Sequence, residues 1–124
     1  MVDDVGITKY AYTAGNQLLT EDGPWASDTV TNSYVNRQRT ALALQQPTGY
    51  WNNGFVYDQA RRLSIVVMSA GTFVYTYPNN SASFRPVKLL LPNTSFITNT
   101  YDSVARMMST KLLNSALSPL DSYA

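Results

Sequence analysis

The sequence has 124 residues, of which 44% are hydrophobic and 14% charged, and its formal net charge is +1. This length predicts one domain with a modest core. The sequence contains no cysteine and no histidine, which excludes disulfides, thiolate chemistry, and the commonest general base and metal ligand. The charged fraction lies below the usual value of about 25%, which indicates either a surface covered by copies of the same chain or a neutral β-rich domain.

Alternating side chains predict strands in the first half of the chain. Residues 7–20 are typical of an N-terminal hairpin, with Ala-Gly-Asn at its turn, and residues 21–28 of a loop. Residues 34–46 alternate, so that Leu42 and Leu44 are expected on one face and Arg37 and Arg39 on the other.

A second run of strands is predicted up to residue 91. Residues 61–69 are rich in β-branched side chains and residues 72–77 resume the pattern. The Ser-Ala-Gly between them is either a bulge in one long strand or a tight turn between two strands. Residues 78–83 are expected to form an exposed loop, and Pro92 ends the last strand, giving a sheet over 34–91.

The last part of the chain has the spacing of an amphipathic helix over 101–117, followed by a tail over 118–124. Tyr101, Val104, Met108 and Leu112 recur at three- and four-residue intervals, as on one helix face. Asp102 in the first turn suits the positive end of the helix dipole. The stripe is interpreted as a dimer contact, with packing inside one chain as the alternative.

The predicted architecture is therefore α+β: an antiparallel β-meander with an N-terminal hairpin, followed by a helix that packs on the sheet in an interlocked dimer. One helix of about 16 residues spans about 24 Å and covers only part of a six-stranded sheet about 29 Å wide. A second chain would supply the missing cover, although a sandwich of the same strands would also hide an apolar face. No internal repeat is recognised.

The charges are segregated along the chain. Residues 29–101 carry a balance of +5, between an acidic start of −4 and a neutral end. Strand parity is expected to put polar and basic side chains opposite the apolar set, on a face that contacts RNA phosphates and bases; the alternative is an ordinary solvated face. This predicted RNA-binding set comprises Arg37, Arg39, Gln45, Arg62, Ser64 and Lys88.

No catalytic equipment is recognised, so the chain is not predicted to be an enzyme. The carboxylates are scattered, and no glycine-rich phosphate loop or metal-binding cluster is evident. No cofactor and no small-molecule substrate are expected. No apolar run has the ~20 residues that a membrane helix needs, and the acidic N-terminus is unlike a secretory leader, so the expected location is a cytoplasm.

The end of the chain resembles the coat proteins of single-stranded RNA bacteriophages, the leviviruses. The resemblance rests on the apolar strand ending in proline, the Thr/Asn/Ser-rich joint, the amphipathic pattern and the Pro-containing tail of residues 87–124. The segments "RTALALQQ" and "RRLSIVVM" resemble the central hairpin of that family's sheet.

The resemblance implies a capsid protein that dimerises and self-assembles into an icosahedral shell around single-stranded genomic RNA. It further implies binding of an RNA hairpin as a translational repressor, and assembly of the virion in a bacterial cytoplasm. The alternatives are another β-rich phage structural subunit, from a tail or connector, and a small single-strand nucleic-acid-binding protein.

Overall fold

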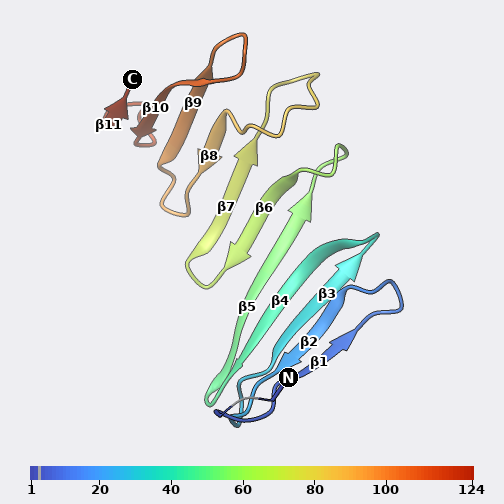
Figure 1. Ribbon diagram of the computed structural model, residues 1–124. Coiled ribbons are helices and arrows are strands. Elements are labelled where there is room, and N and C mark those ends of the chain that lie inside the picture. Colours follow the sequence, from blue (N-terminus) through green and yellow to red (C-terminus); the bar gives the residue numbers. More distant parts are fainter. Residues whose placement is uncertain (3) are drawn as a thin grey trace. The chain divides into compact units, whose positions relative to one another are not determined.

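The computed structural model describes residues 1–2 and 4–124, and over these residues it contains eleven strands and no helix (Figure 1). The predicted α+β class is therefore wrong, and the chain is all-β. Each strand runs antiparallel to the neighbours with which it pairs. The chain divides into two compact units, Met1–Phe55 and Val56–Ala124, with β5 contributing to both.

Unit 1 is a meander whose strands pair in chain order. Its elements are β1 (Lys9–Tyr12), β2 (Leu18–Asp22), β3 (Val30–Val35), β4 (Gln38–Gln46) and the larger part of β5 (Gly49–Tyr57). The β3–β4 connection is a two-residue turn in which Asn36 and Arg37 have φ values of 50° and 65°. Positive φ at both central residues matches the right-handed twist of the strands that such a turn connects.

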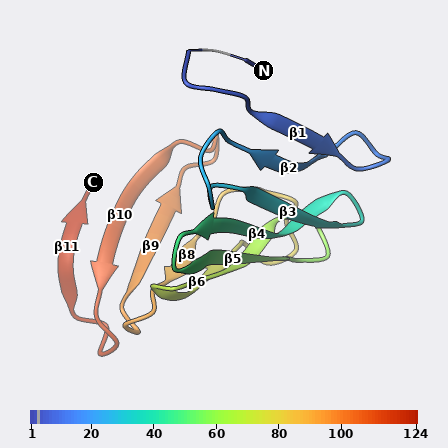
Figure 2. The same ribbon diagram turned by 90° about the horizontal axis from the view of Figure 1, so that it is seen from below.

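Unit 2 continues the same pattern. Its remaining elements are β6 (Leu63–Met68), β7 (Gly71–Thr76), β8 (Lys88–Leu90), β9 (Phe96–Tyr101), β10 (Met107–Leu113) and β11 (Pro119–Tyr123). Figure 2 shows β9, β10 and β11 side by side. The Ser-Ala-Gly stretch is a tight turn and not a bulge, because Met68 pairs with Gly71. Gly71 has φ 118°, and a Cβ there would lie 2.5 Å from the Cβ of Pro92.

The predicted C-terminal helix over 101–117 is replaced by β9, β10 and β11. Ala105 has φ 74°, which a right-handed helix does not allow. The Asp102 carboxylate accepts hydrogen bonds from the amides of Val104 and Arg106, at 3.0 and 2.8 Å. An aspartate offers the same acceptor to a helix N-terminus and to a turn, so Asp102 was an ambiguous helix signal. Within the described residues, the structure has no helix that could cross a membrane.

The predicted helix stripe is consequently dispersed. Tyr101 ends β9, Val104 lies in the following turn, Met108 is an extra residue in β10, and Leu112 lies within β10. Val104 and Met108 are exposed, whereas Leu112 is half-buried. These four side chains do not share one face in a single chain.

The buried interior is small. Among the described residues, only Val66 and Phe96 are buried apolar side chains, each 7% exposed. Phe96 shares a face with Leu90, Val74 and Ile65 through consecutive strand pairs, and Val66 follows Ile65 and so points to the opposite face. The apolar side chains of unit 2 are therefore divided between two faces, and Val67 is 47% exposed.

Candidate functional site

Five connections of the sheet are built in the same way, over residues 13–17, 58–62, 91–95, 102–106 and 114–118. In each, the first residue donates its backbone N–H to the carbonyl of the fifth, and the fourth donates to the carbonyl of the first. The fourth residue is left-handed in all five, with φ values of 60° at Asn16, 62° at Arg61, 68° at Thr94, 74° at Ala105 and 65° at Leu117. This is the three-residue hairpin loop that combines a type I turn with a left-handed residue.

In the three of these turns that follow β1, β5 and β9, the side chain of the first residue anchors the turn. Thr13, Asp58 and Asp102 accept the backbone N–H of the fifth residue at 3.1, 2.9 and 2.8 Å. A tyrosine ends the strand before each turn, and a leucine or methionine begins the next strand. We call these turns 1, 2 and 3, over residues 13–17, 58–62 and 102–106.

The turns mark an internal repeat that sequence reasoning missed. Their preceding tyrosines, Tyr12, Tyr57 and Tyr101, lie 45 and 44 residues apart and end β1, β5 and β9. The first two periods therefore contain four strands each, β1–β4 and β5–β8, and the third contains β9, β10 and β11. The signal was present in the sequence as Tyr-Thr/Asp-x-x-x-Gln/Arg-Leu/Met, but the tyrosine is the one position that is identical in all three stretches, so the repeat does not stand out. A period of this length is typical of repeat proteins.

The fifth residue of turns 1 and 2 reaches a loop about twenty residues further along the chain. The Gln17 side chain donates to the carbonyl of Arg37 at 3.0 Å. The Arg62 guanidinium donates to the carbonyls of Ser81 and Ser83 at 2.7 and 2.9 Å. Each such side chain therefore holds the end of a later hairpin against its own turn.

A tyrosine from the later hairpin completes each contact. Tyr34 donates its hydroxyl to the carbonyl of Leu18 at 2.8 Å, and Tyr77 donates to the carbonyl of Leu63 at 2.7 Å. The Arg62 guanidinium also lies over the Tyr77 ring, 4.3 Å from its centroid, and is paired with Asp58 at 2.7 Å. These contacts leave the Arg62 side chain only 11% exposed.

Turn 3 has the same hydrogen bonds within the turn as turns 1 and 2, but its fifth side chain, Arg106, is exposed to solvent. Arg106 pairs with Asp102 at 2.7 Å, yet the Arg106 side chain is 79% exposed. On the other side of the turn, Arg85 donates to the carbonyl of Ala105 at 2.7 Å and lies over the Tyr101 ring. Turn 3 is thus contacted by the hairpin before it, and no later loop in the described chain covers Arg106.

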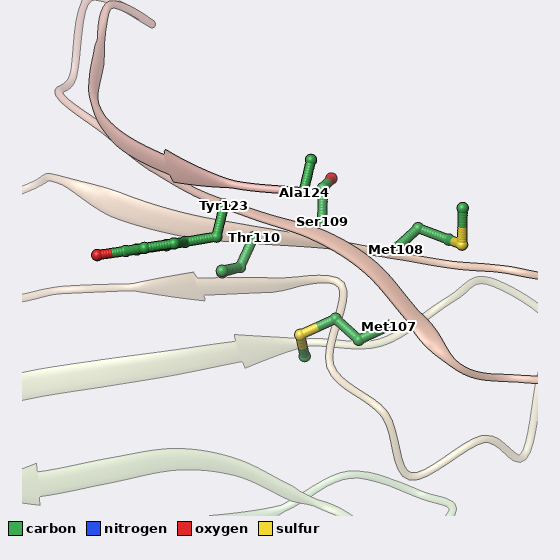
Figure 3. Close-up of a pocket in the computed structure, with 6 residues that line it drawn as sticks. All are labelled: Met107, Met108, Ser109, Thr110, Tyr123 and Ala124. Carbon is green, nitrogen blue, oxygen red and sulfur yellow. The ribbon is translucent and has the colours of Figure 1, made fainter.

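A shallow pocket lies next to the open side of turn 3 (Figure 3). It has a volume of about 210 Å³ and is lined by Met107, Met108, Ser109, Thr110, Tyr123 and Ala124. Strand β11 ends at Tyr123, which pairs with Thr110. Residues 107–109 of β10 are therefore not paired with β11.

The unit 1 members of the predicted RNA-binding set do not share a face. Arg37 lies in the β3–β4 turn. Arg39 approaches Asn32 and lies over the Phe55 ring, on the face of Leu42 rather than opposite it. The reason is a bulge at Thr40, which reverses the parity of β4. Gln45 follows Leu44 and points to the other face.

The unit 2 members are also divided. Arg62 is held by turn 2, and the Ser64 hydroxyl donates to the carbonyl of Val56. Lys88 pairs with Thr76 on the face of Ile65, opposite Ser64, and its ammonium lies 4.1 Å from the Phe96 ring centroid. The one continuous basic face that the parity argument required is therefore not formed within either unit. RNA binding by these residues stays a prediction.

The ionisable groups with shifted pKa values lie in turns 2 and 3 or contact turn 2. Backbone hydrogen bonds from Arg62 and Arg106 lower the pKa values of Asp58 and Asp102, respectively, and each paired guanidinium acts in the same direction. Burial raises the pKa of Tyr77. Among the described residues, no group of three or more acidic side chains is placed to hold a metal ion. The chemistry of this site is hydrogen bonding to main-chain carbonyls.

Acid should weaken the fold through these two aspartates. Their lowered pKa values contribute stability above the ordinary value of 3.8, and this stability is lost as the pH falls through the folded-state pKa. The midpoint of urea unfolding should therefore change little from about pH 7 to pH 5 and fall below about pH 4.

The double variant D58N/D102N is the control for this effect. The Asn114 amide oxygen accepts the same two kinds of backbone bond in its own turn, so asparagine should preserve the geometry. The double variant should show a flatter pH dependence. An unchanged acid transition would show that other groups cause it.

Comparison with known proteins does not assign the chain. No model of a known protein family matches the sequence, and no curated protein sequence matches it. The functional argument therefore rests on the repeated turns and on the exposed apolar side chains.

Proposed function

We propose that this chain is a structural β-repeat module that associates with copies of itself and has no catalytic role. The observation that carries the proposal is the small interior. Only Val66 and Phe96 are buried apolar residues in the described chain, and no side chain there is fully buried. Folding of a domain this long normally requires burial of about two-thirds of its unfolded surface.

The repeat explains why so much apolar surface stays exposed. A repeat unit contacts mainly its neighbours along the array, and its stability comes from the interfaces between units. Stacked repeats bury a continuous core together, and roughly three or more are needed for stability. Ile65, Val67, Val74 and Leu90 form one such stripe in unit 2, in which Val67 and Leu90 are 47% and 36% exposed.

Self-association is the first test of this proposal. Sedimentation velocity over about a hundredfold range of concentration should show species larger than a monomer that increase with concentration. The variant V67K places a charge in the apolar stripe and should shift the chain toward monomer. The matched control S69K adds the same charge in the neighbouring turn and should not. A wild-type chain that stays monomeric throughout would contradict the proposal.

The more specific expectation, an RNA-packaging phage shell, keeps only part of its support. The amphipathic helix on which the resemblance largely rested is absent from the described residues. The low charge and self-association remain compatible with a coat, tail or connector subunit. Electron microscopy and the ultraviolet absorbance ratio of the assembled fraction test this directly, because closed particles rich in nucleic acid are expected only for the packaging role.

A further inference from the structure

We propose that copies of this chain associate end to end, with the Arg37 guanidinium of one copy over the Trp25 ring of the next. This inference rests on the proposed function, because it names a contact through which the copies associate. Trp25 lies in the loop between β2 and β3, and Arg37 lies in the turn between β3 and β4. Both belong to unit 1, and these two connections lie at opposite ends of β3 (Figure 1).

The loop that carries Trp25 is held by hydrogen bonds to its two flanking aspartates. The Asp28 carboxylate accepts the backbone N–H groups of Gly23 and Trp25, at 3.1 and 3.0 Å. The Asp22 carboxylate accepts the Thr29 hydroxyl at 2.7 Å. The backbone at Trp25 is therefore fixed, although this residue is 67% exposed. A large aromatic side chain on a fixed loop loses little freedom on binding, and tryptophan is enriched among the residues that dominate protein interfaces.

The two ends of β3 carry opposite charge. Three carboxylates lie at the end that carries the tryptophan, those of Glu21, Asp22 and Asp28. Lys9 lies opposite Asp22 in β1, so the acidic groups at this end outnumber the basic one. Arg37 and Arg39 lie at the other end, where neither the β3–β4 turn nor turn 1 contains an acidic residue. Charges arranged in this way favour contact between the unlike ends of two copies over contact between like ends.

An arginine over an aromatic ring is a recurring contact in this protein. Arg62 lies over the Tyr77 ring and Arg39 over the Phe55 ring, at 4.3 and 5.0 Å from the centroids. Arg37 is exposed in its turn. Its guanidinium and the exposed indole are the two halves of the same kind of contact, and an indole is the best aromatic partner for a cation.

The two halves cannot meet within one chain. Strand β3 has six residues and spans about 20 Å, at roughly 3.3 Å per residue. This separation exceeds the reach of either side chain. Every copy presents both halves, so the contact between two copies is one-sided and leaves one half free on each. The copies are therefore joined in series along the direction of β3, as a ring or an open filament.

Charge reversal at either end tests this contact. Sedimentation velocity at about 0.05 M salt should show self-association that is about tenfold weaker in R37E than in the wild type. A26K places an ammonium beside Trp25 at an exposed position and should weaken association to a similar extent. The double variant R37E/A26K should associate again, because the new carboxylate of one copy then meets the new ammonium of the next.

The matched controls are K111E and S115K, which make the same changes of charge at exposed positions of unit 2. Both should associate like the wild type, whereas W25A should associate more weakly and W25F should retain part of the effect. Circular dichroism establishes that each variant is folded. The inference is overturned by equal association of R37E and K111E, by normal association of W25A, or by no recovery in the double variant.

The variant V67K separates failure of this inference from failure of the proposed function. If V67K weakens association while R37E and W25A do not, the proposed function stands and the end-to-end contact is absent. A wild-type chain that stays monomeric would overturn both.

Discussion

Replacement of Arg62 by alanine should lower the free energy of unfolding by about 2–3 kcal/mol. The variant loses two charged hydrogen bonds to the Ser81 and Ser83 carbonyls and the contact with the Tyr77 ring. These interactions connect turn 2 to the loop between β7 and β8. Urea unfolding followed by circular dichroism measures the effect, and hydrogen exchange should show faster opening of residues 77–87.

R106A is the matched control, because it removes the same side chain from the same position of turn 3. The Arg106 guanidinium is largely exposed and pairs only with Asp102. Exposed ion pairs contribute little to stability, so R106A should unfold close to the wild type. Equal losses for the two variants would show that the loop contacts of Arg62 contribute nothing measurable.

Replacement of Phe96 by alanine should be more damaging, with a loss of about 3–4 kcal/mol. Phe96 is one of only two buried apolar side chains in the described residues, and it pairs across the sheet with Leu90 and Leu113. Lys88 also lies over its ring and would lose that contact. The cavity left behind has few neighbours that can move to fill it.

F84A is the control for the Phe96 variant, because Phe84 is 70% exposed and lies in the loop before β8. An exposed substitution of this kind should change stability by no more than about 0.5 kcal/mol. Urea titrations of both variants, at one protein concentration, measure the difference. A small loss for F96A would mean that the interior of unit 2 is not the source of its stability. It would also indicate that contacts between copies dominate.

The open and occupied turns suggest a simple division of roles within the repeat. Each turn fixes its own hairpin through the first side chain, Thr13, Asp58 or Asp102. In turns 1 and 2 the fifth side chain then binds a later segment of the chain. The hydrogen bonds within a turn therefore do not depend on the contact between its fifth side chain and a later loop. Turn 3 accordingly keeps the same hydrogen bonds although Arg106 is exposed.

The sequence by itself determined the local β structure and several of its connections. The alternation in residues 34–46, the Ala-Gly-Asn turn and the strand end before Pro92 all depend on neighbouring residues. Side-chain parity failed at Thr40, because this residue is an extra one in β4 and a bulge leaves no clear mark in the sequence.

The tertiary structure alone decided the C-terminal fold and the candidate site. Asp102 can cap a helix or a turn, and the antiparallel pairing of β10 with β9 and β11 selects the turn. Whether the predicted basic residues share a face also depended on the tertiary structure, since the position of an arginine is set by distant partners. Arg62 and Arg106 follow the same local pattern, and only the loop at Ser81–Ser83 makes one occupied and leaves the other open.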